Sequence, residues 1–235
     1  MAADMFLAMT GAEIEKSEEI PEKTAWMACH FSPYSTGLSN LPRMLPEGSF
    51  LILNDLAPMH GHDPVRIWQE LAACVDTFRC CGLLLDFQRE GYPDILNLII
   101  TLLQGLPCPV VVSDLYARDF DCPVFLPPVP PSCTLQSHID PWQDRKIWLE
   151  IGTDGEEIVL TESGTTVTSL PRFAVPDAGF SEEKLHCHYS IDVTEHATFT
   201  LWRTKEDLAA LIEEAETNGV AGMIGLYQEF HSLAI

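Results

Sequence analysis

The chain has 235 residues, of which 46% are apolar and 20% charged, so it can bury a substantial core and does not have a disordered composition. Thirteen Lys and Arg residues against 35 Asp and Glu residues give a net charge of −22, which disfavours nucleic acid and membrane surfaces as partners. Eight cysteines without a C-x-x-C pair, no basic leader and no apolar run of about 20 residues predict a soluble, cytoplasmic protein without a disulfide framework.

Secondary structure is predicted from residue 24 onward, where short β-rich runs alternate with helical patterns. Residues 1–23 are acidic, and we expect an N-terminal tail or a short docking helix there. The predicted strands are Ala25–Phe31, Phe50–Asn54, Gly82–Phe87, Pro109–Ser113, Pro123–Leu126, Lys146–Ile151 and Ala221–Tyr227. The predicted helices are Asp63–Phe78, Pro93–Leu106 and Thr204–Asn218, the last with Asp207 placed for a capping box.

The first strands are apolar on both faces and begin about 25 to 35 residues apart, which is typical of parallel strand–helix units. This spacing fits an α/β barrel or a doubly wound sheet. The later part of the chain has a different pattern. Residues 146–170 predict antiparallel strands with turns at Asp154-Gly155 and Ser163-Gly164. A second antiparallel pair is predicted at Leu185–Val193 and Ala197–Trp202. We therefore predict one α/β domain over residues 24–235, a (β/α)8 TIM-like barrel that is irregular or incomplete and has an antiparallel insertion at about 152–202.

Polar residues follow the predicted parallel strands, where the loops of such folds gather around a ligand. They are His30, Tyr34, Asp55, Asp86, Gln88, Asp114, Tyr116, Glu150, Tyr227, Gln228 and Glu229. Carboxylates, amides and aromatic rings suit a hydroxyl-rich ligand, although any single acid here could also cap the following helix. We expect a site around Asp86, Gln88, Asp114 and Tyr227, with Asp86 and Asp114 within about 15 Å at a shared barrel mouth.

The segment Cys81-Gly-Leu-Leu-Leu-Asp-Phe-Gln88, followed by Gly91-Tyr-Pro93, resembles the D-G-x-D-x-D-x-E signature of the family 18 glycoside hydrolases, the chitinase-like TIM barrels. The stretches Ala197–Leu208 and Gly219–Tyr227 are similar to the end of spore-type members, with Leu226 or Tyr227 in place of a tryptophan. In the family the glutamate is the general acid and the last aspartate orients the acetamido group of the substrate. The resemblance puts that aspartate at Asp86 and the glutamate at Gln88.

The first two aspartates of the signature fall on Cys81 and Leu84. The family signature lies on the fourth barrel strand, whereas Gly82–Phe87 is the third strand predicted here, so one strand is missing from the prediction or the match is accidental. An amide has no proton to give near neutral pH. Gln88 therefore implies loss of the usual mechanism, unless Glu90, two residues along the same strand face, acts as a relocated acid.

The resemblance thus implies a catalytically degenerate barrel that binds a saccharide, a peptidoglycan-like or another polar ligand, or serves as a scaffold for a protein partner. The expected ligand-binding residues are Asp86, Gln88, Asp114, Tyr116, Tyr34, Glu150 and Tyr227. The alternative is an active hydrolase, either a glycosidase that uses Glu90 or a metal-dependent barrel enzyme that uses His60, His62, His186 and His188. Since no H-E-x-x-H or C-x-x-C supports these histidines, we expect neither tightly bound zinc nor another cofactor.

Overall fold

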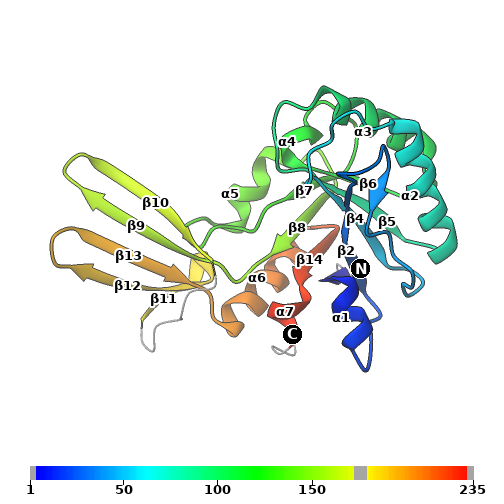
Figure 1. Cartoon of the computed structure of the whole chain (residues 1–235). Coiled ribbons are helices and arrows are strands. Elements are labelled where there is room, and N and C mark those ends of the chain that lie inside the picture. The colour runs from blue at the N-terminus through cyan, green and yellow to red at the C-terminus, as the bar shows by residue number, and fades with distance from the viewer. Residues whose placement is uncertain (1–3, 172–178, 232–235) are drawn as a thin grey trace.

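Eight parallel strands close into a barrel in the computed structural model, which describes residues 4–171 and 179–231 (Figure 1). Going around the barrel, they are β1 (Asp4–Met9), β2 (Thr24–Phe31), β4 (Phe50–Asn54), β5 (Gly82–Asp86), β6 (Val110–Ser113), β7 (Val124–Leu126), β8 (Ile147–Ile151) and β14 (Gly222–Leu226). The pairing of β1 with both β14 and β2 closes the ring. The two-residue strand β3 (Leu38–Ser39) adds an antiparallel edge to β2. The predicted α/β barrel is confirmed.

The N-terminal segment, expected as a tail or a short docking helix, contains a barrel strand and a short helix. Residues Asp4–Met9 form the first barrel strand, with Phe6 and Ala8 facing the interior and Met9 facing the outer layer. Thr10 then caps the short helix α1 (Gly11–Lys16) through a capping box with Glu13. With β1 counted, β5 is the fourth strand of the barrel, which is the place of the signature in family 18.

Helices cover the outside of the barrel unevenly. The predicted helices appear as α2 (Pro64–Phe78), α3 (Pro93–Gly105) and α6 (Lys205–Thr217), the last with the expected capping box. Shorter ones are α4 (Asp114–Ala117), α5 (Leu135–Ile139) and α7 (Tyr227–Phe230), with 3-10 turns at Asp140–Trp142 and Glu183–Leu185. The connection from β2 to β4 contains no helix. Among the described helices, none has the length and apolar character needed to span a membrane.

The barrel interior is filled by aromatic side chains near the start of its strands. The rings of Phe50 and Trp148 lie 4.6 Å apart, and Phe6 packs on both of them. Room for these rings comes from two glycines, because a Cβ on Gly82 would collide with Phe50 and one on Gly222 would collide with Trp148. The bottom of the barrel is therefore closed, and only its carboxyl-terminal mouth is open to a ligand.

A five-stranded antiparallel sheet projects from the barrel between β8 and α6 (Figure 1). We call it the arm; its order is β10 (Gly164–Leu170), β9 (Gly155–Thr161), β13 (Ala197–Trp202), β12 (Cys187–Val193) and β11 (Phe180–Glu182). The predicted late antiparallel insertion is confirmed. The turn expected at Asp154-Gly155 is wrong, because β8 pairs with its barrel neighbours and β9 pairs with β10 and β13. Asp154-Gly155 is instead the point where the chain leaves the barrel.

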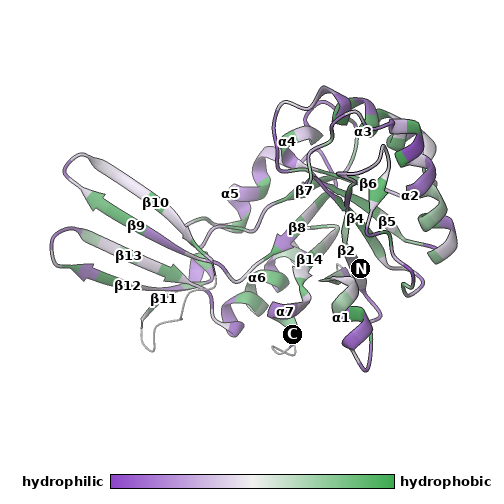
Figure 2. Ribbon diagram, in the orientation of Figure 1, coloured by the Kyte–Doolittle hydropathy of each residue, from purple (hydrophilic) through white to green (hydrophobic). Residues whose placement is uncertain are grey.

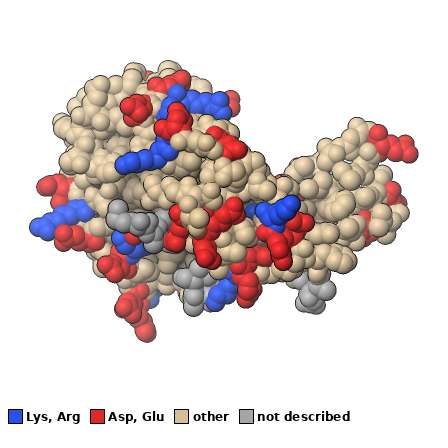
Figure 3. Space-filling view, turned by 180° about the vertical axis from the view of Figure 1, so that it is seen from behind, with Lys and Arg blue, Asp and Glu red and all other residues tan. Residues whose placement is uncertain are grey.

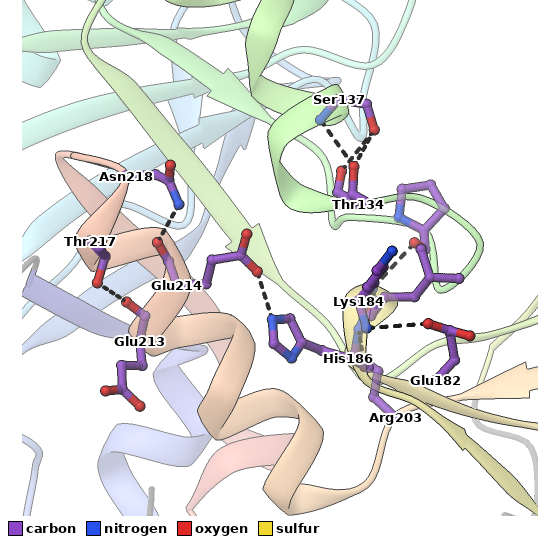
Figure 4. Close-up of polar contacts among 12 residues, drawn as sticks. Thr134, Ser137, Glu182, Lys184, His186, Arg203, Glu213, Glu214, Thr217 and Asn218 are labelled. Carbon is purple, nitrogen blue, oxygen red and sulfur yellow. Dashed lines mark hydrogen bonds and ion pairs between the residues drawn. The ribbon is translucent and has the colours of Figure 1, made fainter.

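Polar contacts hold the base of the arm against the barrel. Buried Arg203 donates hydrogen bonds to four backbone carbonyls, two in the proline-rich loop after β7 and two at the start of β12. His186 Nε2 lies 2.6 Å from Glu214 of α6, and His188 Nδ1 lies 2.8 Å from Asp207 (Figure 4 shows the first pair). These contacts join the arm, the loop and α6 into one structure.

Candidate functional site

The barrel mouth contains two connected hollows. A cleft of about 590 Å³ lies over the ends of β2, β4 and β5, and a cavity of about 70 Å³ lies beneath it inside the barrel. Both are lined by Met27, Asn54 and Asp86; the cleft adds, among others, His30, Asp55, Gln88 and Arg89, and the cavity adds Glu150 and Leu226. The cleft thus has the volume for a small polar ligand, and the carboxyl groups of Asp86 and Glu150 both line the smaller cavity.

Asp86 and Gln88 form the floor of the cleft. Gln88 Nε2 donates a hydrogen bond of 2.5 Å to Asp86 Oδ1. The carboxylate of Asp55, which is buried, accepts from the backbone N–H groups of Gln88 and Arg89 at 3.1 and 2.8 Å and so fixes the loop. Burial raises the pKa of Asp86, with a smaller contribution from the charge of Asp55, while the hydrogen bond from Gln88 opposes the rise.

Glu150 provides the second carboxyl group of the cavity. It lies near the end of β8 and points into the barrel with Trp148. Burial, followed by the negative charges of Asp86, Glu229 and Asp154, raises its pKa to about 7. Among the described residues no group donates a hydrogen bond to its carboxyl oxygens. Glu150 is therefore partly protonated near neutral pH, and its protonated carboxyl group can donate a hydrogen bond to a ligand.

The relocated acid expected at Glu90 does not lie on the strand face of Gln88. β5 ends at Asp86, so the alternation of a strand does not extend to residue 90. Glu90 is exposed and precedes Gly91, whose φ of +80° turns the chain toward α3. The spacing argument for Glu90 is wrong because the strand is shorter than its apolar pattern indicated.

Two of the predicted tyrosines pack outside the barrel. Tyr116 is buried between the barrel and its helices, and its hydroxyl donates to the backbone carbonyl of Arg89 at 2.5 Å. Tyr227 begins α7 and stacks on His231 with ring centroids 4.7 Å apart. Tyr116 therefore holds the loop that carries Gln88. A direct ligand contact by either tyrosine stays a prediction.

The two remaining predicted residues, Tyr34 and Asp114, follow β2 and β6. Tyr34, in the loop after β2, is 95% exposed. Asp114 follows β6 and accepts a hydrogen bond from the backbone N–H of Leu115. Burial lowers the pKa of His138, and the charge of Asp114 opposes that change, so these two side chains lie near one another. Neither Tyr34 nor Asp114 lines the two hollows.

The histidines of the metal hypothesis have other partners. His62 is buried, with Nε2 at 2.9 Å from the carbonyl of Ser32 and Nδ1 accepting from the backbone N–H of His60. His186 and His188 contact the carboxylates of α6, as described above. Within residues 4–171 and 179–231 no three His, Cys, Asp or Glu side chains are grouped as metal ligands. The geometry gives no support to a metal-dependent hydrolase.

Sequence reasoning missed Asn54, which lines both hollows. Its Nδ2 donates to the carbonyl of Met27 at 2.9 Å, and its Oδ1 accepts from Leu56 N–H at 3.1 Å. Asn54 lies beside Asp86 in the parallel register of β4 and β5. The signal was its position as the last residue of an apolar strand, one residue before the more obvious Asp55.

Comparison with known proteins gives the fold. No protein-family model and no curated protein sequence matches the chain. Its structure is similar to the spore cortex-lytic enzyme SleL of Bacillus cereus, with a TM-score of 0.61 and 9% identity over 99% of this chain and 74% of that one. It is also similar to a chitinase from Chromobacterium violaceum, with a TM-score of 0.57 and 10% identity over 95% and 93% of the two chains.

A third similar structure is a GH18 chitinase from Cycas revoluta in complex with (GlcNAc)3. The TM-score is 0.60 and the identity 9%, over 98% of this chain and 97% of the chitinase. At these identities the likeness concerns the fold. The chain therefore has the chitinase-like TIM-barrel fold that GH18 chitinases and the cortex-lytic enzyme SleL share.

Proposed function

We propose that this chain is a catalytically degenerate relative of the family 18 glycoside hydrolases that binds an N-acetylglucosamine-type saccharide at the barrel mouth. The fold, the open cleft and a polar lining of amide and carboxyl groups support this proposal. The chitinase from Cycas revoluta, which has the same fold, was solved with (GlcNAc)3. We extend that ligand class to this chain on the likeness of the fold.

The observation that carries the proposal is the pair Asp86 and Gln88 on the floor of the cleft. β5 is the fourth barrel strand, and the sequence resemblance aligns Gln88, two residues after it, with the signature glutamate. Hydrolysis by the family mechanism needs a proton donor at this position, which an amide cannot be. Leu84, at the position of the middle aspartate, is buried in the apolar interior. The pair can still hydrogen-bond a sugar through one carboxylate and one amide.

Calorimetric titration with GlcNAc oligosaccharides tests the binding. We expect wild type to bind, and Asp86→Ala to bind at least about 10-fold more weakly, since a hydrogen bond to a charged group contributes about 1.5–3 kcal/mol. Glu162→Ala, at the tip of the arm, is the control and should bind like wild type. Wild type that binds none of these oligosaccharides contradicts the proposal.

Hydrolysis of an aryl chitobioside tests the degeneracy. We expect no turnover by wild type and none by Gln88→Glu, because a glutamate beside Leu84 lacks the second carboxylate that tunes its protonation. The double variant Gln88→Glu with Leu84→Asp restores both groups and is the positive comparison. Turnover by the single variant alone would show that one carboxylate on the strand is sufficient.

One observation favours a second candidate, an active glycosidase with the acid on β8. Glu150 lines the same cavity as Asp86, and its pKa of about 7 gives it the charge state that a general acid needs. In that case wild type hydrolyses the aryl glycoside, and Glu150→Gln lowers the rate by about 100-fold or more, which is the usual contribution of general acid catalysis. Wild-type turnover that survives Glu150→Gln would exclude this candidate.

A further inference from the structure

One face of the arm is apolar from edge to edge. Residues directly opposite one another on antiparallel strands share a face, so the pairing register of the strands defines the rows of that face. The outer row joins Thr165, Leu160, Ala197 and Val193, and the next row joins Val167, Ile158, Phe199 and Ile191. The row nearest the barrel contains Ser169, Glu156, Leu201, Tyr189 and Phe180. The outer two rows contain no charged residue. We call these three rows the apolar arm face.

The opposite face of the same strands is polar. Its rows contain Thr166, Val159, Thr198 and Asp192, then Thr168, Glu157, Thr200 and Ser190. The arm is therefore an amphipathic sheet by its register, and Figure 2 shows hydrophobic stretches on β9 and β13. A sheet with this pattern ordinarily packs its apolar face against a second layer.

In the described part of the chain only the base of the apolar arm face has such a layer. There the carboxylate of Glu156 accepts from the backbone N–H of Ser132, and Arg203 donates to the carbonyl of Val129, so the proline-rich loop lies against this end. Farther out, large apolar side chains are exposed: Leu160 by 41%, Ile191 by 45%, Val167 by 55% and Val193 by 74%, with Phe180 at 64% on the row nearest the barrel. None of these five belongs to either buried cluster of the barrel.

We propose that the apolar arm face of one copy packs on the same face of a second copy, which makes a reversible two-layer dimer. Charge favours a second copy over a charged partner, because the outer rows present no charge for such a partner to pair with. Figure 3 likewise shows the arm largely without charged residues, apart from acidic groups toward its tip and base. A self-complementary face with a two-fold axis is the commonest way for identical chains to associate.

The area of the face decides how strong this dimer is. Four strands about 4.8 Å apart, with about six residues each at about 3.4 Å, give a face of roughly 400 Å² per copy. Two such faces bury roughly 800–1,000 Å², which is at the low end for specific interfaces and typical of weak, transient association. We therefore expect a dissociation constant in the micromolar range, in contrast to a permanent dimer.

Sedimentation of the full chain from about 1 to about 200 μM, a range that brackets micromolar association, tests the proposal. We expect the average mass to rise from one copy toward two copies with concentration. The rise should grow with added salt, because salt screens the repulsion between two chains of net charge −22 and leaves apolar contacts intact.

A matched pair of variants tests which face is used. Val167→Lys with Ile191→Lys places two cations on the apolar arm face and should keep the chain monomeric at every concentration. Thr166→Lys with Ser190→Lys makes the same change of charge on the neighbouring residues of the opposite face and should associate at least as well as wild type. Circular dichroism confirms that each variant is folded.

Three outcomes would overturn the proposal: wild type that stays monomeric throughout, apolar-face variants that still dimerise, or control variants that lose the dimer as completely. The test uses neither a saccharide nor hydrolysis, so its result is independent of the proposed ligand site.

Discussion

At the scale of single residues, the barrel mouth concentrates two carboxyl groups that no cation among the described residues neutralises. Asp86 is hydrogen-bonded to Gln88, and Glu150 faces it in the same cavity. Burial raises both pKa values; the charge of Asp55 adds to the rise at Asp86, and the charges of Asp86, Glu229 and Asp154 add to the rise at Glu150, whose pKa reaches about 7. Since no salt bridge between described residues includes either group, the cavity lowers its charge by holding a proton.

This arrangement predicts a pH-dependent cost to stability. The pKa of Glu150 is about 7 in the folded chain against an ordinary value of 4.5, so the folded state binds the proton more tightly than the unfolded state. Below about pH 4.5 both states are protonated and Glu150 has no effect. Between about pH 4.5 and 7 the folded state loses relative stability as pH rises, by at most about 3 kcal/mol.

Replacement of Glu150 by glutamine should remove that cost. We expect Glu150→Gln to raise the free energy of unfolding at pH 8 by about 1–3 kcal/mol and to leave it nearly unchanged at pH 4. Urea denaturation at the two pH values measures this, with Glu162→Gln at the exposed tip of the arm as the control. A variant that is less stable than wild type at pH 8 would contradict the account.

At the scale of elements, large side chains inside the barrel lie opposite small residues on other strands. Gly82 of β5 has no side chain because the ring of Phe50 on β4 occupies that space. We expect Gly82→Ala to destabilise the fold by about 1–3 kcal/mol, the usual cost of overpacking. The double variant with Phe50→Leu should recover part of this loss, and a double-mutant cycle measures the coupling. Strictly additive effects would show that the two residues do not compete for space.

The attachment of the arm depends on one buried side chain, Arg203. Burial lowers its pKa, yet its guanidinium stays protonated and donates to four carbonyls from two segments of the chain. Arg203→Lys keeps the charge but cannot reach all four, so we expect a loss of about 2–4 kcal/mol and faster proteolysis within the arm. The control is Arg79→Lys in the exposed pair with Glu47, which should behave like wild type. Equal effects of the two changes would contradict this role.

At the scale of the whole molecule, closure of the barrel depends on β1. Phe6 is 2% exposed and packs on Phe50 and Trp148 inside the barrel. We expect Phe6→Ala to lower the free energy of unfolding by about 3–5 kcal/mol, as truncation of a buried aromatic ring usually does. Leu56→Ala is the comparison, since Leu56 is 74% exposed and should be nearly neutral. A small effect of Phe6→Ala would mean that the barrel is stable without this strand.

The sequence by itself predicted most of the barrel. Strands such as Phe50–Asn54 and helices such as Pro64–Phe78 were recognisable because each has a local signal, an apolar run or a capped amphipathic period. β1 was missed although residues 5–9 are an apolar run, because a short apolar run alone does not distinguish a strand from other buried segments. These residues form a strand because they pair with β2, which is near in sequence, and with β14, which is at the other end of the chain.

The site was also predicted only in part, because some of its residues are close in sequence and others are brought together by the fold. Asp86 ends β5 and Gln88 follows two residues later, so the sequence fixes their spacing and local reasoning placed both in the cleft. Three features depend on which strands pair in the fold. They are the charge repulsion between Glu150 and Asp86, the hydrogen bond by which Tyr116 holds the loop, and the exposed apolar arm face. Sequence thus determined the types of element and the glutamine at position 88 after the strand, since both are read from neighbouring residues. Tertiary structure alone decided the barrel closure and the raised pKa of Glu150, because burial and charge repulsion act between residues distant in the chain.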